Sequence, residues 1–261
     1  MGELSKISFI VVNYKSEQCL ENCVVSIQRF LKDTQKKEIL VINNDSQEKL
    51  KDFAQKFPQV SVITMPTNIG FSRAGNKGSG LAKGEILFFI NPDAEILEGK
   101  LEEIENCLNQ NKSGIVGVKL VDKEGILQKW SFGESINPVN LLLNKLPPFF
   151  RSGEAKNKTK KVGWVSGGGL AIKKELFHKL GGFDENFFMY FEDVDLARRT
   201  KKMGYDVIWN PNILIKHLGG VSSQTEKEKK EKYYQSQEYY FRKHFGKDVS
   251  TWVSFFRKRF N

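Results

Sequence analysis

The chain has 261 residues, with 41 basic and 31 acidic side chains and a formal net charge of +10. A length above about 200 residues suits one large α/β domain with an extension, and it buries a core without disulfides or structural metal. The three cysteines, Cys19, Cys23 and Cys107, include no C-x-x-C pair, which argues against a disulfide framework and a zinc site and favours reduced thiols in the cytoplasm.

Short apolar runs alternate with amphipathic stretches through the first half of the chain. Strands are predicted at residues 7–12, 38–42, 60–65 and 85–90, with helices at 16–31, 48–57 and 72–81 between them. This βαβαβαβ order predicts a mostly parallel sheet covered on both faces by helices. Ligands of such sheets bind at the carboxyl ends of the strands, so the polar residues that follow each strand are the candidates for function.

The second half begins with a predicted helix at 98–109 and a strand at 114–121. Periodicity is then lost from 131 to 161, and a loop of this length is usually functional, so we expect a flexible flap over the site. A strand at 162–165, a short strand and helix up to residue 180, and a helix at 196–203 that ends at Gly204 follow. Residues 223–261 are expected to form a helical appendage to a domain at 1–222.

The C-terminal tail is basic and aromatic. Residues 242–261 hold six basic side chains and one acidic side chain, and the aromatic residues in and next to this segment are Phe241, Phe245, Trp252, Phe255, Phe256 and Phe260. Such a segment favours an anionic membrane surface, and packing of the aromatic rings on the protein is the alternative. No nucleic-acid-binding motif accompanies it, so no nucleic-acid partner is expected. No run resembles a signal peptide or a membrane span, so we expect a soluble or membrane-surface protein.

Phosphate-binding loops and hydrolase motifs are absent from the sequence. The glycines at 78, 80 and 84 miss the G-x-G-x-x-G spacing by one residue and precede a strand, and no G-x-x-x-x-G-K-S/T or G-x-S-x-G occurs. The three histidines, His178, His217 and His244, lack a matching nucleophile motif. A hydrolase triad is therefore not expected.

Two polar groups follow predicted strands. Asp45, in the Asn43-Asn44-Asp45-Ser46 run, could accept the N–H of a uracil or thymine ring, although the run also suits an Asx turn. Asn91-Pro92-Asp93 offers one carboxylate that, with diphosphate oxygens and water, would suit Mg²⁺ or Mn²⁺, although it too suits a plain turn.

A third group, Glu192-Asp193-Val194-Asp195, packs three carboxylates into four residues beside several aromatic residues. Neighbouring negative charge and apolar surroundings raise a carboxylate pKa, which makes a better proton acceptor near neutral pH. The ordinary alternative is that acidic residues gather at a helix N-terminus and that Asp195 pairs with Arg199 one turn later.

Taken in order, these motifs resemble family 2 glycosyltransferases, and most nearly their rhamnosyltransferase-like branch, which acts in O-antigen and cell-wall polysaccharide assembly. The resemblance covers about residues 5–220 and rests on Val11-Val12-Asn13-Tyr14, Asn43-Asn44-Asp45-Ser46, the segment 68–78, Asn91-Pro92-Asp93, Gly167-Gly168-Gly169 and Glu192-Asp193-Val194-Asp195. It implies an α/β fold of the GT-A type, an inverting single displacement and a divalent metal, Mg²⁺ or Mn²⁺.

The resemblance also assigns roles to individual residues. The residues of the donor site are Asp45, which reads the pyrimidine base, Asn13 and Tyr14 beside the nucleotide, Asn68, Gly70, Arg73 and Asn91 around the donor, and Gly168 and Gly169, which allow its close approach. Asp93 is the metal-binding acid, and His217 resembles a histidine that completes the metal site. Asp193 matches the catalytic base, with Glu192 beside it. Asn91 replaces the first carboxylate of the family's D-x-D motif, which lowers the expected metal affinity.

The expected donor is therefore a TDP- or UDP-sugar, with L-rhamnose as the sugar by resemblance to the branch. The expected acceptor is a saccharide or a lipid-linked saccharide, bound near residues 131–161, in the cytoplasm or at the inner face of the plasma membrane. A non-catalytic module that binds sugar nucleotides or polysaccharides on the same fold is the alternative, and the set of Asp93, Asp193 and His217 argues against it. A nucleotidyltransferase is disfavoured because the first strand ends in Asn13-Tyr14-Lys15-Ser16, without a glycine-rich loop.

Overall fold

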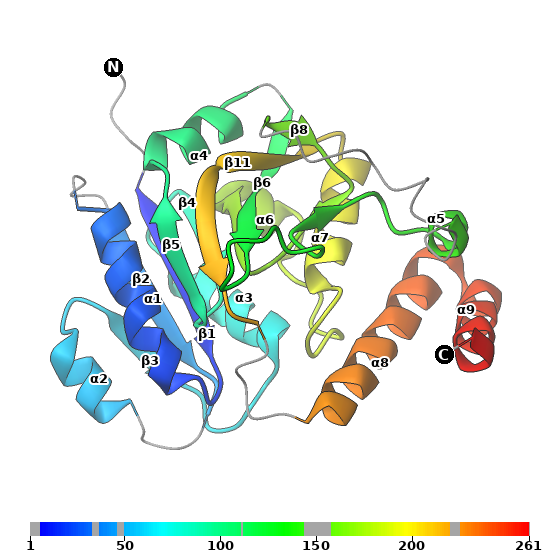
Figure 1. The fold of residues 1–261 in the computed structure, drawn as a ribbon, viewed down its shortest axis with the longest axis horizontal. Helices are drawn as coiled ribbons and strands as arrows, with labels where there is room; N and C mark the ends of the chain where they lie inside the picture. Colours follow the sequence, from blue (N-terminus) through cyan, green and yellow to red (C-terminus); the bar gives the residue numbers. More distant parts are fainter. Residues whose placement is uncertain are drawn as a thin grey trace.

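A mixed sheet forms the centre of the molecule in a computed structural model of the chain (Figure 1). The structure describes residues 6–32, 37–45, 50–110, 112–143, 158–219 and 225–260, without the side chains of 141–143 and 256–260. Nine strands of these residues form the sheet in the order β3-β2-β1-β4-β10-β6-β11-β5, with β8 paired to β11. The strands are β1 Ile7–Asn13, β2 Lys37–Asn43, β3 Ser61–Thr64, β4 Ile86–Ile90, β5 Ala94–Glu98, β6 Ser113–Val121, β8 Lys160–Lys161, β10 Gly169–Lys173 and β11 Asp206–His217.

The strand directions confirm the predicted βαβαβαβ order of the first half. Strands β3, β2, β1 and β4 are mutually parallel. Strand β10 runs antiparallel to both β4 and β6, β11 is parallel to β6, and β5 is antiparallel to β11. The ends of β1, β2, β4 and β11 therefore lie along one edge of the sheet, which we call the carboxyl edge.

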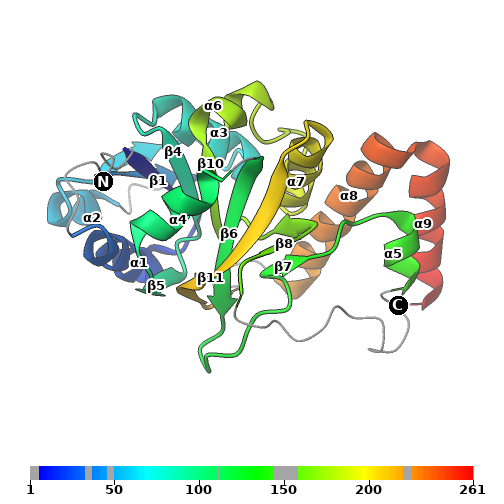
Figure 2. The ribbon, with the colours of Figure 1, turned by 90° about the horizontal axis from the view of Figure 1, so that it is seen from above.

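Helices cover both faces of the sheet because its central strands are apolar on both sides. In β1, Ile7, Phe9 and Val11 contact one hydrophobic cluster, whereas Ile10 and Val12 contact the other. Full burial of such a side chain stabilises the fold by about 1.5–3 kcal/mol. The first cluster includes α1 Glu17–Phe30, α2 Lys51–Lys56 and α4 Leu101–Leu108, and the second includes α3 Phe71–Leu81, α6 Lys174–Lys179 and α7 Glu192–Lys202 (Figure 2).

Several predicted boundaries were wrong where long-range pairing decides the structure. Residues 94–97, for which no element was predicted, and residue 98, the predicted start of a helix, form β5 because Ile96 pairs with Ile215 of β11. Of the predicted strand at 162–165, only β9 Trp164–Val165 is a strand, and it pairs with β7. Strand β8 lies before it, at 160–161, and pairs with β11. Helix α7 starts at Glu192 and not at 196, so Glu192 and Asp193 lie in its first turn.

The segment 131–161 is partly ordered, contrary to the expectation of an unpatterned flap. It holds β7 Phe132–Gly133, which pairs with β9 in a separate two-stranded sheet, and α5 Pro138–Leu143. Residues 144–157 lie outside the described part of the chain. Each of these elements is too short to generate a hydrophobic period, so the sequence did not reveal them.

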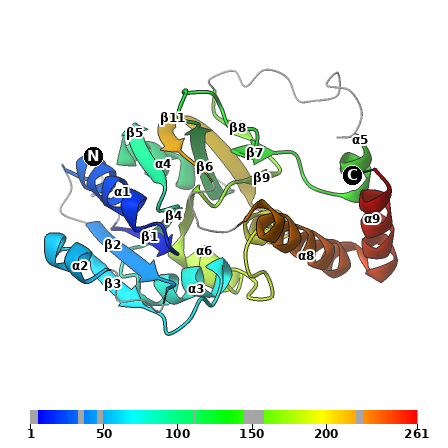
Figure 3. The same cartoon turned by 60° about the horizontal axis from the view of Figure 1, so that its bottom comes forward.

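Two C-terminal helices, α8 Glu226–Phe245 and α9 Lys247–Phe260, form the expected appendage. A capping box between Thr225 and Glu228 begins α8, and Gly246, at φ +92°, separates the two helices. Helix α8 begins beside the carboxyl edge of the sheet and runs away from it (Figures 1 and 3).

The appendage packs on the body through its aromatic residues, as the alternative reading of the tail predicted. Tyr240 and Phe241 of α8 and Val253 of α9 share a buried cluster with Phe187, Phe191 and Val194 of the segment around the start of α7. Trp252 and Phe255 are exposed at 37% and 62%, and the side chains of Phe256 and Phe260 lie outside the described residues. Within the described part of the chain, no helix is long and apolar enough to cross a membrane.

Candidate active site

A strand pairing brings the two predicted metal ligands together. The Asn91-Pro92-Asp93 turn lies between β4 and β5, and His217 ends β11, opposite Ala94 of β5. This register brings His217 Nε2 to 3.4 Å from Asp93 Oδ1 and to 3.0 Å from Asn91 Nδ2. Both His217 and Asp93 are buried at the carboxyl edge.

Gln128, which the sequence reasoning missed, orients the histidine. Its Oε1 atom lies 2.9 Å from His217 Nδ1, and its Nε2 atom donates to the His217 carbonyl at 2.7 Å. A proton on Nδ1 leaves the lone pair on Nε2, which faces Asp93. No sequence signal marks Gln128, because its loop meets β11 only in the folded protein.

The Asp93–His217 pair has the chemistry of a divalent-metal site. Burial alone would raise the pKa of Asp93, but the hydrogen bond and the charge of His217 in its protonated form, together with backbone hydrogen bonds, outweigh burial and hold the pKa below its ordinary value. A carboxylate oxygen and an imidazole nitrogen 3.4 Å apart suit adjacent ligands of one octahedral ion with bonds of about 2.1 Å. Among the described residues, no group of three His, Cys, Asp or Glu side chains forms a complete protein cage, so other ligands would be needed.

The glycine turn 167–169 joins this pair to the carboxylates of α7. A Cβ atom on Gly168 would lie 3.4 Å from Asn91 Nδ2, and one on Gly169 would lie 2.5 Å from Val118. Gly167 N–H donates to Asp193 Oδ2 at 2.9 Å. The turn therefore lies beside Asn91 on one side and hydrogen-bonds Asp193 on the other, and a side chain at 169 would clash with Val118 of β6.

Glu192 and Asp193 lie next to each other in the first turn of α7 and have different partners. Asp193 accepts hydrogen bonds from Gly167 N–H and from Val194 N–H, at 2.9 and 2.8 Å. Glu192 is 7% exposed, and its Oε2 atom has no hydrogen-bond partner among the described residues. Burial raises the pKa of both carboxyls, and the charge of Asp193 raises that of Glu192 further, whereas Gly167 N–H opposes the rise at Asp193. The raised pKa favours the protonated form of both carboxyls.

Two left-handed residues precede these carboxylates. Tyr190 and Phe191 have φ values of +68° and +66°, a conformation that costs non-glycine residues on the order of 1 kcal/mol each. The Phe191 ring is held between Tyr233 and Tyr240 of α8, with ring centroids 5.2 and 5.4 Å away. The appendage therefore holds the turn that aims Glu192 and Asp193.

Asp195, the third carboxylate of the motif, does not belong to the site. It is fully buried and accepts hydrogen bonds from Arg199 Nε, Lys243 Nζ and His244 Nε2 at 2.6–2.7 Å, so the predicted pair with Arg199 is confirmed. Burial would raise the pKa of Asp195, but His244, Arg199 and Lys243 outweigh it and hold the pKa below its ordinary value. Asp195 thus ties α7 to α8.

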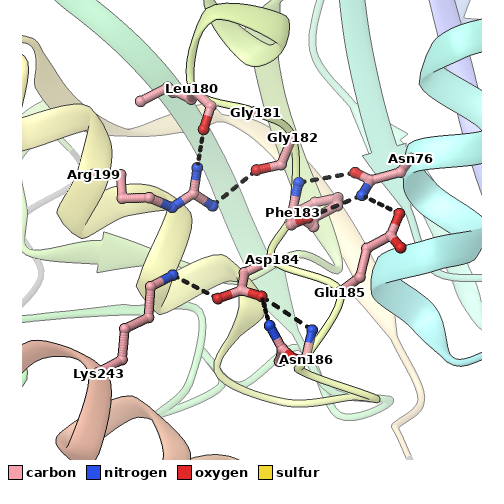
Figure 4. A pocket seen from close by; sticks show the side chains of 10 residues that line it. All are labelled: Asn76, Leu180, Gly181, Gly182, Phe183, Asp184, Glu185, Asn186, Arg199 and Lys243. Atoms are coloured by element: carbon pink, nitrogen blue, oxygen red, sulfur yellow. Dashed lines mark hydrogen bonds and ion pairs between the residues drawn. The ribbon is translucent and has the colours of Figure 1, made fainter.

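Lys243 and Arg199 extend this junction into a surface pocket of about 390 Å³ (Figure 4). Lys243 Nζ also bonds Asp184 at 2.7 Å, and Arg199 bonds the carbonyls of Leu180 and Gly182 at 2.7 and 2.8 Å. The polar groups of this pocket are therefore largely engaged with one another. The pocket marks the joint between the body and the appendage and lies apart from the Asp93–His217 pair.

The predicted nucleotide residues lie at the ends of β1 and β2. Asn13 donates to Asn43 Oδ1 at 3.1 Å, Asp45 is buried at 6% exposure, and Tyr14 is half-buried. Ser46 lies outside the described residues. Arg73 is largely exposed and lies 3.6 Å from Glu185.

Asn44 organises the loop that carries Asn68 and Gly70. It donates to Asn68 Oδ1 at 2.8 Å and to the Gly70 carbonyl at 3.2 Å, and it accepts from Ile69 N–H at 2.9 Å. Gly70 has φ +86°, and a Cβ atom there would lie 2.6 Å from the Phe188 carbonyl. Asn68 and Gly70 therefore hold the loop against the segment that leads to α7.

Comparisons with known proteins agree with this architecture. The family model described as "Glycosyl transferase family 2" matches residues 8–181, about two thirds of the chain, and a model described as "N-terminal domain of galactosyltransferase" matches residues 150–227. The chain therefore belongs to glycosyl transferase family 2.

Individual relatives extend the comparison. The chain is 24% identical to the low-salt glycan biosynthesis hexosyltransferase Agl10 of Haloferax volcanii over 78% of this chain and 64% of that protein. It is 25% identical to the N-acetylglucosaminyl-diphospho-decaprenol L-rhamnosyltransferase of Mycobacterium tuberculosis over 80% of this chain and 74% of that protein. The crystal structure of GalNAc-T7 with UDP, GalNAc and Mn²⁺ superposes with a TM-score of 0.64 and 17% identity, over 90% of this chain and 48% of that one. The fold is the GT-A fold, and the chain spans only part of each relative.

We expect Asp195→Asn to lower the free energy of unfolding by about 3 kcal/mol, because Arg199, Lys243 and His244 lose their buried counter-charge. Since the pKa of Asp195 is lowered by folding, its stabilisation is complete above about pH 4 and is lost as the pH falls through the folded value. Urea unfolding at pH 7 and at lower pH measures both effects.

The matched control is Asp206→Asn, which removes the partner of Lys161 in a surface pair of 2.7 Å. The Lys161 side chain is 72% exposed and that of Asp206 is 28% exposed, so loss of this surface pair should cost about 0–1 kcal/mol. Equal losses for the two variants would contradict the assignment of Asp195 as the ionic junction.

Proposed function

We propose that the chain is a metal-dependent, inverting glycosyltransferase that moves a sugar from a nucleoside-diphosphate donor to an acceptor hydroxyl. One observation carries the proposal. The glycine turn 167–169 contacts Asn91, beside the Asp93–His217 pair, and hydrogen-bonds Asp193 through Gly167. A metal-binding pair and a carboxylate of raised pKa thus lie on the two sides of one turn at the carboxyl edge of the sheet.

The metal site follows from the donor set. Asp93 and His217 would hold Mg²⁺ or Mn²⁺, and diphosphate oxygens and water would fill the remaining positions. The bound ion would supply positive charge that stabilises the departing diphosphate. Support for a divalent ion also comes from GalNAc-T7, which was crystallised with UDP and Mn²⁺.

Asp193 is proposed as the base. It would take the proton of the acceptor hydroxyl as that oxygen bonds to the anomeric carbon and the bond to the diphosphate breaks on the opposite side, which inverts the configuration. Its raised pKa matches a proton acceptor near neutral pH, and Gly167 N–H fixes its orientation. Glu192, whose pKa is raised by burial and by the charge of Asp193, would in its protonated form donate a hydrogen bond beside the base.

The donor is proposed to be a TDP- or UDP-sugar read by Asp45, with Asn13, Tyr14, Asn68, Gly70 and Arg73 around it. L-rhamnose as the sugar and a lipid-linked saccharide as the acceptor are supported by the name of the mycobacterial relative. We assign the reaction to the cytoplasm, consistent with three free cysteines, and we retain residues 1–222 as the catalytic domain with 131–161 on the acceptor side.

Attachment to the inner face of the plasma membrane through the tail is part of the proposal. Lys243 is engaged with Asp184 and Asp195, so the charge available to lipid is reduced to the remaining basic residues of 242–261. We expect the full chain to co-sediment with vesicles that contain anionic lipid at low salt, to be released at high salt, and not to bind neutral vesicles. Equal binding to neutral vesicles would contradict an electrostatic attachment.

The first test is a thermal-shift panel of UDP, TDP and GDP, each with and without Mn²⁺. A ligand that binds only the folded state raises the melting temperature by mass action. We expect a shift with TDP or UDP that depends on Mn²⁺ and is lost in Asp93→Ala. The Asp206→Asn variant should retain the shift. The absence of any nucleotide shift in the wild type would contradict the donor site.

Asp193→Asn distinguishes an enzyme from a binding module. Since Asp193 does not contact the Asp93–His217 pair, the variant should retain the metal-dependent nucleotide shift but lose about 10²–10⁴-fold in sugar transfer. The wild-type rate should rise with pH as Asp193 loses its proton, through a pKa above the ordinary carboxyl value. Unchanged transfer in the variant, measured as release of nucleoside diphosphate, would remove Asp193 from the role of base.

A further inference from the structure

An exposed tyrosine of the appendage lies beside the proposed base. Tyr233 of α8 is 41% exposed, and its ring contacts Phe191, two residues before Asp193, with centroids 5.2 Å apart. The ring of Tyr190 contacts the ring of Tyr233 edge-to-face, with centroids 5.9 Å apart. We call Tyr190 and Tyr233 the aromatic platform.

The platform is rigid although part of it faces solvent. The Phe191 ring contacts Tyr233 and also buried Tyr240, two turns further along α8, whose ring centroid lies 5.4 Å from that of Phe191. The Asp195 cluster, through Lys243 and His244, then fixes α8 against α7. A ring held in this way loses little conformational entropy when it binds a ligand.

The carboxylates of α7 affect the pKa of both tyrosines of the platform. Burial raises the pKa of Tyr233, and the charges of Tyr234 and Asp193 raise it further. Burial likewise raises the pKa of Tyr190, with Glu192 as the next cause. The two rings therefore lie within electrostatic range of the proposed base and of its neighbour.

Glu192 supplies an independent sign of a missing ligand. More than nine tenths of its surface is buried, yet its Oε2 atom has no partner among the described residues. An unsatisfied buried polar atom costs about 1–3 kcal/mol, so a ligand that hydrogen-bonds Oε2 would stabilise the site. Burial and the charge of Asp193 raise the pKa of Glu192, which favours the protonated carboxyl, and a protonated carboxyl can donate to a hydroxyl oxygen.

An apolar ring face beside hydrogen-bonding carboxyls matches the surface of a pyranose. One face of a sugar ring presents C–H groups and its edge presents hydroxyls, and binding sites commonly combine aromatic walls with a few placed polar groups. A lipid chain would require apolar surface without the carboxyls. A nucleobase is not the expected occupant, because the proposed nucleobase site is at Asp45, at the ends of β1 and β2.

We propose that Tyr233 and Tyr190 bind the pyranose ring of the acceptor, while Glu192 hydrogen-bonds one of its hydroxyls and another hydroxyl faces Asp193. The proposal rests on the proposed function and deepens it, because it gives α8 a direct part in the site. It applies equally to a free saccharide and to the sugar of a lipid-linked one.

The test uses the full chain with methyl pyranosides of glucose, galactose, N-acetylglucosamine and rhamnose as probes, in the presence of Mn²⁺ and of the nucleotide selected by thermal shift. Saturation-transfer NMR measures binding without turnover. We expect saturation of ring C–H protons in the wild type and at least a severalfold loss in Tyr233→Ala. No signal for any pyranoside in the wild type would overturn the proposal.

Kinetics then separate the acceptor from the donor. With the sugar that binds, Tyr233→Ala should raise the KM for the acceptor about tenfold and leave the KM for the donor unchanged. Tyr233→Leu keeps an apolar contact with Phe191 but removes the aromatic face, so it should show the same loss even if the alanine variant is unstable. Phe255→Ala, an exposed aromatic residue of α9 at 62% exposure, is the matched control and should match the wild type.

Each remaining outcome has one meaning. An unchanged acceptor KM in Tyr233→Leu, or an equal rise in the donor KM, would overturn the platform. Binding of the pyranoside without any nucleotide shift would instead contradict the donor site and leave the sugar subsite standing. Binding lost equally in Phe255→Ala would assign the signal to nonspecific aromatic contact and would also overturn the proposal.

Discussion

The hydrogen bond from Gly167 N–H to Asp193 Oδ2 links the carboxyl edge of the sheet to the first turn of α7. On one side lies the sheet edge, where the β11–β5 register pairs His217 with Asp93. On the other lies the first turn of α7, reached through two left-handed residues. The bond forms only because the 167–169 turn passes close to Asn91 without side chains of its own. Separation of the two parts would move the Asp93–His217 pair away from the proposed base.

The three carboxylates of the α7 motif illustrate how partners decide roles. Asp195 has hydrogen bonds to Arg199, Lys243 and His244, Asp193 has two backbone N–H groups, and one Glu192 oxygen has no described partner. Their pKa shifts follow this order: lowered at Asp195, raised at Asp193 and raised further at Glu192. Four residues of one helix therefore provide a structural anion, a candidate base and a candidate hydrogen-bond donor, because helical geometry points their side chains into different surroundings.

The appendage is part of the working structure and more than a tail. Tyr240 and Phe241 are buried against the start of α7, and Lys243 and His244 neutralise Asp195. Phe241 and Lys243, two of the tail residues that suggested binding to a membrane surface, thus contact the body of the protein. The family 2 match ends at residue 181, so α7 and α8 lie beyond it, although the proposed chemistry depends on both.

The sequence by itself determined the βαβ order, the sheet edge at which Asn13, Asp45 and Asp93 gather, and the family. The strand order and the sheet edge follow from hydrophobic periodicity and from the rule that parallel strands end on one side. The family follows from the resemblance of the ordered motifs and is shown by the family 2 match. Only the tertiary structure decided the pairing of His217 with Asp93, the orienting contact of Gln128, the early start of α7 and the contacts of Tyr233. Each depends on strand register or helix packing between distant segments, and no local pattern encodes which of several compatible partners a side chain will meet.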